Sequence, residues 1–65
     1  MSYYNPSDLD IFMTEIDKCI NYGNPNMLLN TIKKYKNIIE QKHIDAAMNM
    51  YNELINEIIE SLVIT

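Results

Sequence analysis

After Pro25 the sequence contains no glycine or proline, so no residue in its last forty positions forces a helix to break. One uninterrupted helix of about 38 residues would be roughly 57 Å long at 1.5 Å per residue. The chain before that point holds its only glycine, Gly23, and its other proline, Pro6. No segment shows the alternating apolar and polar pattern of a half-buried strand. The sequence therefore predicts a helical chain whose clearest boundary lies at Gly23–Pro25.

The apolar residues after Pro25 fall into two series with different phase. The first is spaced by four, three and four residues: Leu28, Ile32, Tyr35 and Ile39. The second has similar spacing farther along the chain: Ile44, Met48, Tyr51, Ile55, Ile58 and Leu62. The first series would continue near Lys42 and Asn49, which are polar, so the phase shifts by about two residues, or roughly 200°. This shift predicts a turn near residues 40–43, with one kinked continuous helix as the alternative.

A further helix is expected before Gly23. Ser7 can accept a hydrogen bond from the amide three residues on, and Asp10 stands where a reciprocal capping side chain belongs. Apolar side chains then recur at helical spacing: Leu9, Phe12, Met13, Ile16, Cys19 and Ile20. Gly23 can adopt the left-handed conformation that ends a helix, Asn24 can cap the next helix, and Pro25 suits its first position.

Together these boundaries predict an all-α fold, a small three-helix bundle formed as a single domain by residues 1–65. The helices are expected at about residues 7–22, 25–40 and 43–63. A chain of 65 residues exposes much of its apolar surface unless something else covers it. We therefore expect the protein to be a homodimer.

The side chains that most enzymes need are scarce. The sequence has one His, one Cys and no Arg or Trp, too few groups for a catalytic triad or a cysteine-rich zinc site. Glu40 and His43 have the spacing that di-iron bundles use, but only one such pair is present. Cys19 lies on an apolar helix face, where a thiol acts as a small hydrophobic residue. We expect no enzymatic activity, no cofactor and no metal.

The composition also bears on location and origin. A single cysteine suits a reducing compartment, and no apolar run reaches the roughly 18 residues that span a bilayer. The start of the sequence lacks the basic and apolar regions of a signal peptide. Ile, Asn, Lys and Tyr, which AT-rich codons encode, supply 30 of 65 positions. We expect a cytoplasmic protein that does not bind membranes and is encoded by a virus, phage or mobile element, acting then in the host cytoplasm.

Charge is unevenly distributed along the chain. Residues 1–17 carry a charge of −4, residues 18–44 carry +4 and residues 45–65 carry −4, for a net charge of −4. The basic segment includes Lys33, Lys34 and Lys36, which could contact a nucleic-acid backbone. The sequence has no arginine for base recognition, and acidic segments flank the lysines. We therefore expect no specific nucleic-acid binding and interpret the charges as guiding the packing of the helices.

The expected third helix has more apolar residues than one stripe can use, so it must be covered on two sides. In a monomer it would be the central helix of the bundle. Symmetric self-association is the alternative, because a two-fold axis lets one apolar strip cover itself. The residues expected at that contact are Met48, Tyr51, Ile55, Ile58 and Leu62.

A second set of residues is predicted to contact another protein. Glu53, Glu57 and Glu60 share one face of the third helix, and Tyr3 and Tyr4 precede the first helix. Paired tyrosines are good interface anchors, and glutamates near the negative end of a helix do not contribute to its stability. The sequence thus predicts a non-enzymatic, protein-binding regulator or inhibitor that acts on a host protein. The alternative is a bacterial regulatory or chaperone-like adaptor that binds a partner helix.

Overall fold

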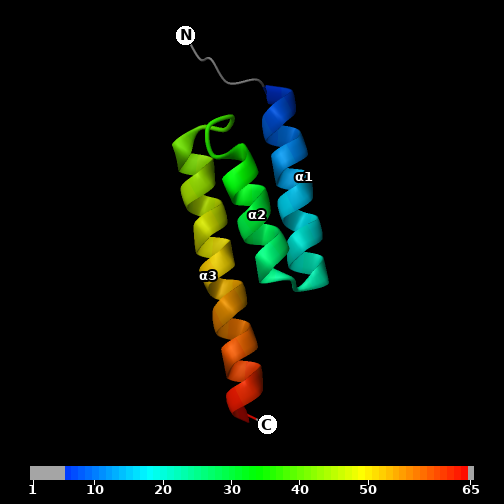
Figure 1. Cartoon of the computed structure of the whole chain (residues 1–65), viewed down its shortest axis with the longest axis vertical. Coiled ribbons are helices and arrows are strands. Elements are labelled where there is room, and N and C mark those ends of the chain that lie inside the picture. The colour runs from blue at the N-terminus through cyan, green and yellow to red at the C-terminus, as the bar shows by residue number, and fades with distance from the viewer. Residues whose placement is uncertain (1–5, 65) are drawn as a thin grey trace.

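The structure, a computed structural model, describes the backbone of residues 6–64 and the side chains of residues 6–63. These residues form three helices: α1 (Pro6–Tyr22), α2 (Pro25–Tyr35) and α3 (Gln41–Ile64) (Figure 1). There is no β-strand among the described residues, so the expected all-α class is confirmed. The first helix begins one residue earlier than expected and the third begins two residues earlier.

The connection between α1 and α2 has the local geometry that the sequence predicts. Gly23 has φ +64°, in the left-handed region. Its N–H donates to the Ile20 carbonyl at 3.0 Å, and the Asn24 N–H donates to the Cys19 carbonyl at 3.2 Å, which is the Schellman pattern. Asn24 Oδ1 then accepts a hydrogen bond from the Met27 N–H at 3.2 Å and caps α2. The two adjacent residues Gly23 and Asn24 therefore both end α1 and begin α2.

The connection between α2 and α3 is a five-residue turn at positions 36–40. The Tyr35 carbonyl accepts hydrogen bonds from the Ile38 and Ile39 N–H groups at 3.0 Å each. The Glu40 carbonyl accepts one from the His43 N–H at 3.0 Å at the start of α3. The chain therefore reverses, and the alternative of one kinked helix is wrong. The second helix is shorter than expected because it ends in this turn at Tyr35, and Ile39 folds inward to 2% exposure.

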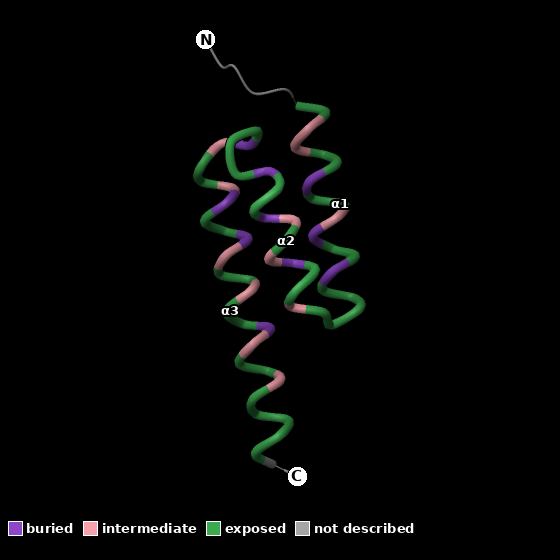
Figure 2. The backbone as a smooth tube through the Cα atoms, viewed as in Figure 1, coloured by how far each residue is buried: buried purple, intermediate pink, exposed green. Residues whose placement is uncertain are grey.

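Helix α2 occupies the middle of the fold and packs against both α1 and α3. The sequence favoured the third helix for that place in a monomer, but α2 is short enough to be covered on both sides by longer neighbours. Its Tyr35 ring lies 5.4 Å from the Phe12 ring of α1, centroid to centroid. The buried residues come from all three helices and from the second turn (Figure 2): Phe12, Ile16, Cys19, Leu28, Ile32, Tyr35, Ile39, Ile44, Ala47 and Leu54.

The three helices differ in length, and this difference shapes the molecule. Helix α3 has 24 residues and α2 has 11, or about 36 Å against about 16 Å at 1.5 Å per residue. The described chain extends 50 Å along its longest axis and 17 Å across. As a result, the C-terminal part of α3 continues past the α1–α2 turn with no helix beside it (Figure 1).

Candidate interaction site

The protruding part of α3, residues 55–63, carries exposed apolar side chains, and we name the apolar side of this part the α3 overhang. Leu54, just before it, is the last buried residue among the described side chains of the helix, at 7% exposure. Ile58 still packs partly against the core. Beyond it, Ile59 is 51% exposed and Leu62 is 72% exposed. The overhang therefore continues the apolar side of α3 into solvent.

The residues predicted for self-association lie along this side of α3. Met48, Tyr51 and Ile58 are half-buried and pack against the core of their own chain. Ile55 is half-buried as well, and Leu62 is exposed. The structure brings the five residues onto one side of the helix but leaves them covered to different degrees. The end of the series, at Leu62, offers the most surface to a second molecule.

The predicted acidic site is on a different face. Glu53, Glu57 and Glu60 are all exposed. At 100° per residue their mean direction differs by roughly 160° from that of Ile55, Ile59 and Leu62. Two of these glutamates, Glu53 and Glu57, edge a shallow hollow of about 70 Å³ that also involves Ile20, Met50 and Leu54. The acidic face and the apolar overhang are thus two surfaces, and one flat partner surface cannot cover both.

Tyr3 and Tyr4, the remaining residues predicted to bind a partner, lie outside the described residues. Their prediction rests on the sequence alone.

Exposed lysines follow α2 and the turn after it. Lys42 and Glu40 form an ion pair at 3.1 Å, the only one among residues 6–63. The Lys34 ammonium lies 5.3 Å from the centre of the Tyr35 ring, which is a cation–π distance. Lys33 and Lys36 are exposed and have no carboxylate partner within the described part of the chain. These two lysines are therefore available to a negatively charged partner.

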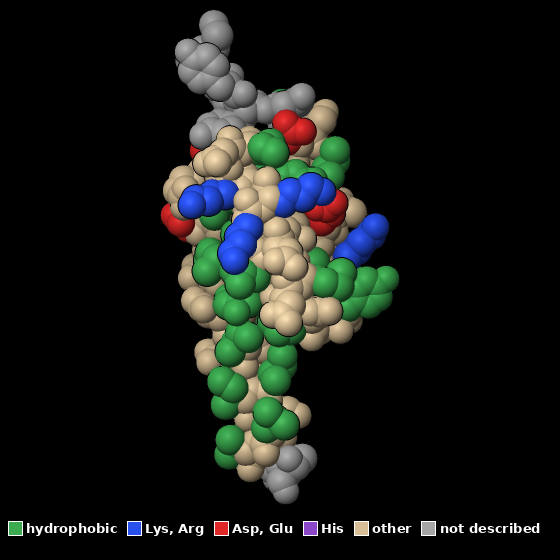
Figure 3. Space-filling model, in the orientation of Figure 1, with side chains coloured by type: hydrophobic (Ala, Val, Ile, Leu, Met, Phe, Trp, Pro, Cys, Tyr) green, Lys and Arg blue, Asp and Glu red, His purple; other side chains and the backbone are tan. Residues whose placement is uncertain are grey.

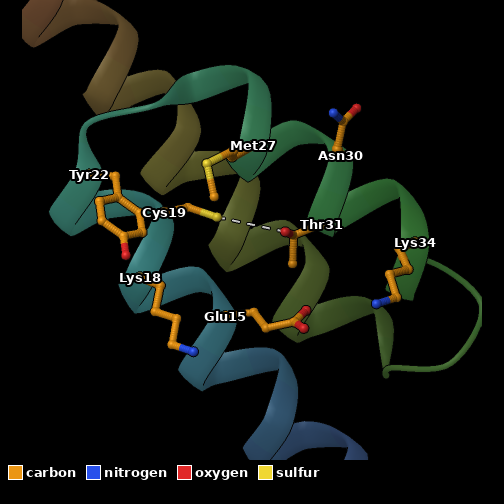
Figure 4. Close-up of a pocket in the computed structure, with 8 residues that line it drawn as sticks. All are labelled: Glu15, Lys18, Cys19, Tyr22, Met27, Asn30, Thr31 and Lys34. Carbon is orange, nitrogen blue, oxygen red and sulfur yellow. Dashed lines mark hydrogen bonds between the residues drawn. The ribbon is translucent and has the colours of Figure 1, made fainter.

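A groove also runs between α1 and α2 (Figure 4) and encloses about 300 Å³. Cys19 lies at its floor, with its Sγ 3.7 Å from Thr31 Oγ1. The other lining residues are polar, charged or apolar side chains from both helices: Glu15, Lys18, Tyr22, Met27, Asn30 and Lys34. Sequence reasoning placed Cys19 in the core, which is confirmed, but missed the groove because its walls come from two helices.

The Cys19 thiol is buried beneath the groove. Cys19 is 2% exposed, and a structural cysteine buried in this way is inert, although Lys18 and Lys34 also line the groove. His43, the only imidazole, instead lines a hollow between α1 and α3 beside Phe12 and Ala46. Cys19 and His43 thus line separate hollows, and no hydrogen bond joins the thiol to the imidazole among the described residues.

Comparisons with known proteins identified no relative of this chain. No protein-family model matches the chain, and the searches of curated proteins and of solved structures found no match either. Within residues 6–63, no three side chains of His, Cys, Asp or Glu gather closely enough to hold a metal ion. Among the helices described, none is both long and apolar enough to cross a membrane.

Proposed function

We propose that this protein is a non-enzymatic, protein-binding regulator that contacts its target through the α3 overhang. One observation carries the proposal: beyond Leu54, apolar side chains at helical spacing continue into solvent, with Leu62 72% exposed and Val63 78% exposed. Removing such side chains from water is favourable by about 25 cal/mol per Å². A helical partner laid along the overhang would pack against the end of α3, as α2 packs against the part of α3 that is nearer the α2–α3 turn.

The same observation allows two kinds of partner. In the first, another protein supplies a helix that covers the overhang, as an inhibited host factor or the target of an adaptor would do. In the second, two copies pair their overhangs about a two-fold axis and complete a larger helical bundle. Glu53, Glu57 and Glu60 would stay in solvent in that dimer because they lie on the far face. Viral or mobile-element origin and a cytoplasmic location stay predictions from composition.

Point variants of the overhang test this function. We expect Leu62→Asp to remove self-association, or to weaken target binding at least tenfold, because it places an unpaired charge in an apolar contact. Asn49→Asp is the matched control, since it adds the same charge at an exposed position of the same helix. Circular dichroism would show that both variants keep the helical fold.

Two measurements are needed, one of self-association and one of target binding. Sedimentation velocity over a range of concentrations reports the oligomeric state of wild type and variants. Affinity capture from host lysate, followed by reconstitution with the purified target, reports the hetero-complex. If Leu62→Asp and wild type sediment alike and bind the same target with the same affinity, the overhang is not the binding element and the proposal is wrong.

A further inference from the structure

Helices α2 and α3 together form a surface that is broader than the overhang. Along α2 and its C-cap Lys36, which keeps helical backbone angles, Leu29, Lys33 and Lys36 follow one another at four- and three-residue steps and so share one flank. On α3, Met48, Ile55 and Ile59 share one flank in the same way. We name these six residues the α2–α3 face: Leu29, Lys33, Lys36, Met48, Ile55 and Ile59.

The position of α1 shows that these two flanks point to the same side. On α2, the opposite flank faces α1, since Met27 and Thr31 line the α1–α2 groove. On α3, the opposite flank also faces α1, since Ala46 and Met50 line the hollow beside Phe12. The remaining flanks of α2 and α3 therefore meet on the side that α1 leaves open. In Figure 3 basic side chains gather on the upper part of the molecule, where the three helices lie together. Apolar side chains continue below them along the protruding part of α3.

We propose that the α2–α3 face binds an amphipathic helix of another protein whose acidic residues flank its apolar stripe. This inference rests on the proposed function and specifies the chemistry of the partner. The apolar stripe would cover Ile55 and Ile59 and continue onto the overhang. Carboxylates on one edge of the partner helix would reach Lys33 and Lys36, which have no acidic partner among the described residues. Charge complementarity of this kind sets the orientation and the association rate of a complex.

A second copy of the chain meets these requirements less well. Its α3 could present Ile55, Ile59 and Leu62, but Glu53, Glu57 and Glu60 lie roughly 160° around the helix from those residues. A partner α3 laid with its apolar side down would therefore keep these three glutamates away from Lys33 and Lys36. The lysines of the α2–α3 face are better matched by a helix whose acidic residues are next to its apolar stripe.

A membrane surface is also a poorer match. Stable electrostatic binding to anionic lipid uses clusters of four to eight basic residues. The α2–α3 face has two, and the whole chain carries a net charge of −4. Anionic vesicles are therefore included as a competing ligand in the test.

The test uses two synthetic helical peptides labelled with fluorescein. Both have Leu and Ile at the first and fourth positions of a seven-residue repeat, but one has Glu and the other has Lys at the flanking positions. Fluorescence anisotropy would measure their binding to the full chain. We expect the acidic peptide to bind at least tenfold more tightly than the basic one, and its association rate to fall as salt is raised.

Charge variants locate the site. We expect Lys33→Glu/Lys36→Glu to weaken binding of the acidic peptide at least tenfold and to favour the basic peptide. Lys18→Glu/Lys42→Glu is the matched control, because it changes the net charge equally at exposed positions outside the α2–α3 face. If the two double variants weaken binding equally, or neither does, the inference is overturned. Lys33→Gln/Lys36→Gln, with a smaller change of charge, repeats the test should the first variant unfold.

The remaining outcomes separate this inference from the proposed function. Suppose neither peptide binds, but wild type is a dimer that Leu62→Asp dissociates. A second copy then covers the overhang, so the inference is overturned and the proposed function stands. Binding to phosphatidylserine vesicles in place of the acidic peptide also overturns it. A monomeric wild type that binds neither peptide nor any target through Leu62 contradicts both.

Discussion

Leu54 and Leu62 lie about two turns apart on the apolar side of α3, yet Leu54 is 7% exposed and Leu62 is 72% exposed. The difference arises because α1 ends and α2 begins at the turn near Leu54, and among the described side chains of α3 none beyond Ile58 packs against the core. One helix thus serves the core in its first part and presents the same kind of side chain to solvent in its last part. This change along α3 is the structural basis of the proposed function.

The two leucines should therefore respond differently to truncation. We expect Leu54→Ala to lower the free energy of unfolding by about 2–5 kcal/mol, because it opens a cavity in the core. Leu62→Ala should change the stability of the monomer by less than about 0.5 kcal/mol, because the side chain is mostly in water already. Urea unfolding followed by circular dichroism at low protein concentration measures both. Equal losses for the two variants would show that the overhang is packed against something in solution.

The left-handed turn at Gly23 gives a second prediction. A Cβ at this position would meet no heavy atom within 4 Å, so substitution costs backbone strain without a clash. We expect Gly23→Ala to lower the free energy of unfolding by about 1–2 kcal/mol, the cost of the left-handed conformation. Gly23→Asn is the matched comparison and should lose less, because asparagine tolerates that conformation better. Thermal unfolding of the two variants gives the order, and a larger loss for Gly23→Asn would contradict this reasoning.

The sequence predicted the first connection well because its causes are local. Gly23, Asn24 and Pro25 are adjacent residues, each with a backbone preference that the turn requires. The second connection lacks such residues. Its approximate place followed from the phase of the apolar series, but the end of α2 at Tyr35 did not, since Lys36 and Ile39 are both compatible with a helix.

The surfaces were less predictable than the helices. The acidic face of α3 follows from spacing on one helix, and the structure shows Glu53, Glu57 and Glu60 exposed together. The α2–α3 face and the α1–α2 groove combine residues of two helices, so they depend on which flanks meet. That arrangement follows from α2 being the middle helix, a tertiary property that apolar periodicity on separate helices does not contain.

Cys19 provides a third prediction, which tests the floor of the α1–α2 groove. Its thiol is 2% exposed and lies near the Thr31 hydroxyl. We expect a thiol-specific disulfide reagent to modify Cys19 only as fast as the chain opens, so added urea should speed the reaction. Asn21→Cys in a Cys19→Ala background is the control, because position 21 on α1 is exposed and should react at once. A folded wild type that reacts as fast as this control would show that the groove is open to its floor.

The last prediction concerns the acidic face of α3. We expect Glu53→Lys/Glu57→Lys/Glu60→Lys to keep or raise thermal stability, since the three side chains are exposed and form no ion pair with another described residue. Glu60 is near the negative end of the helix dipole, where a lysine is favoured over a carboxylate by about 0.3–1 kcal/mol. If the triple variant is stable, a change in its binding cannot be attributed to unfolding.

The acidic face and the α2–α3 face lie on opposite sides of α3, so we expect the triple variant to affect binding at one and not at the other. A target that reaches the acidic face through basic residues should associate more slowly with it, and the wild-type association rate should fall as salt is raised. The acidic peptide, which needs the α2–α3 face, should still bind the triple variant, because the substitutions lie on the other side of the helix. Stopped-flow measurements at two salt concentrations distinguish the cases. Equal association rates of target with wild type and variant would leave Glu53, Glu57 and Glu60 as a solvated face, with binding confined to the overhang and the α2–α3 face.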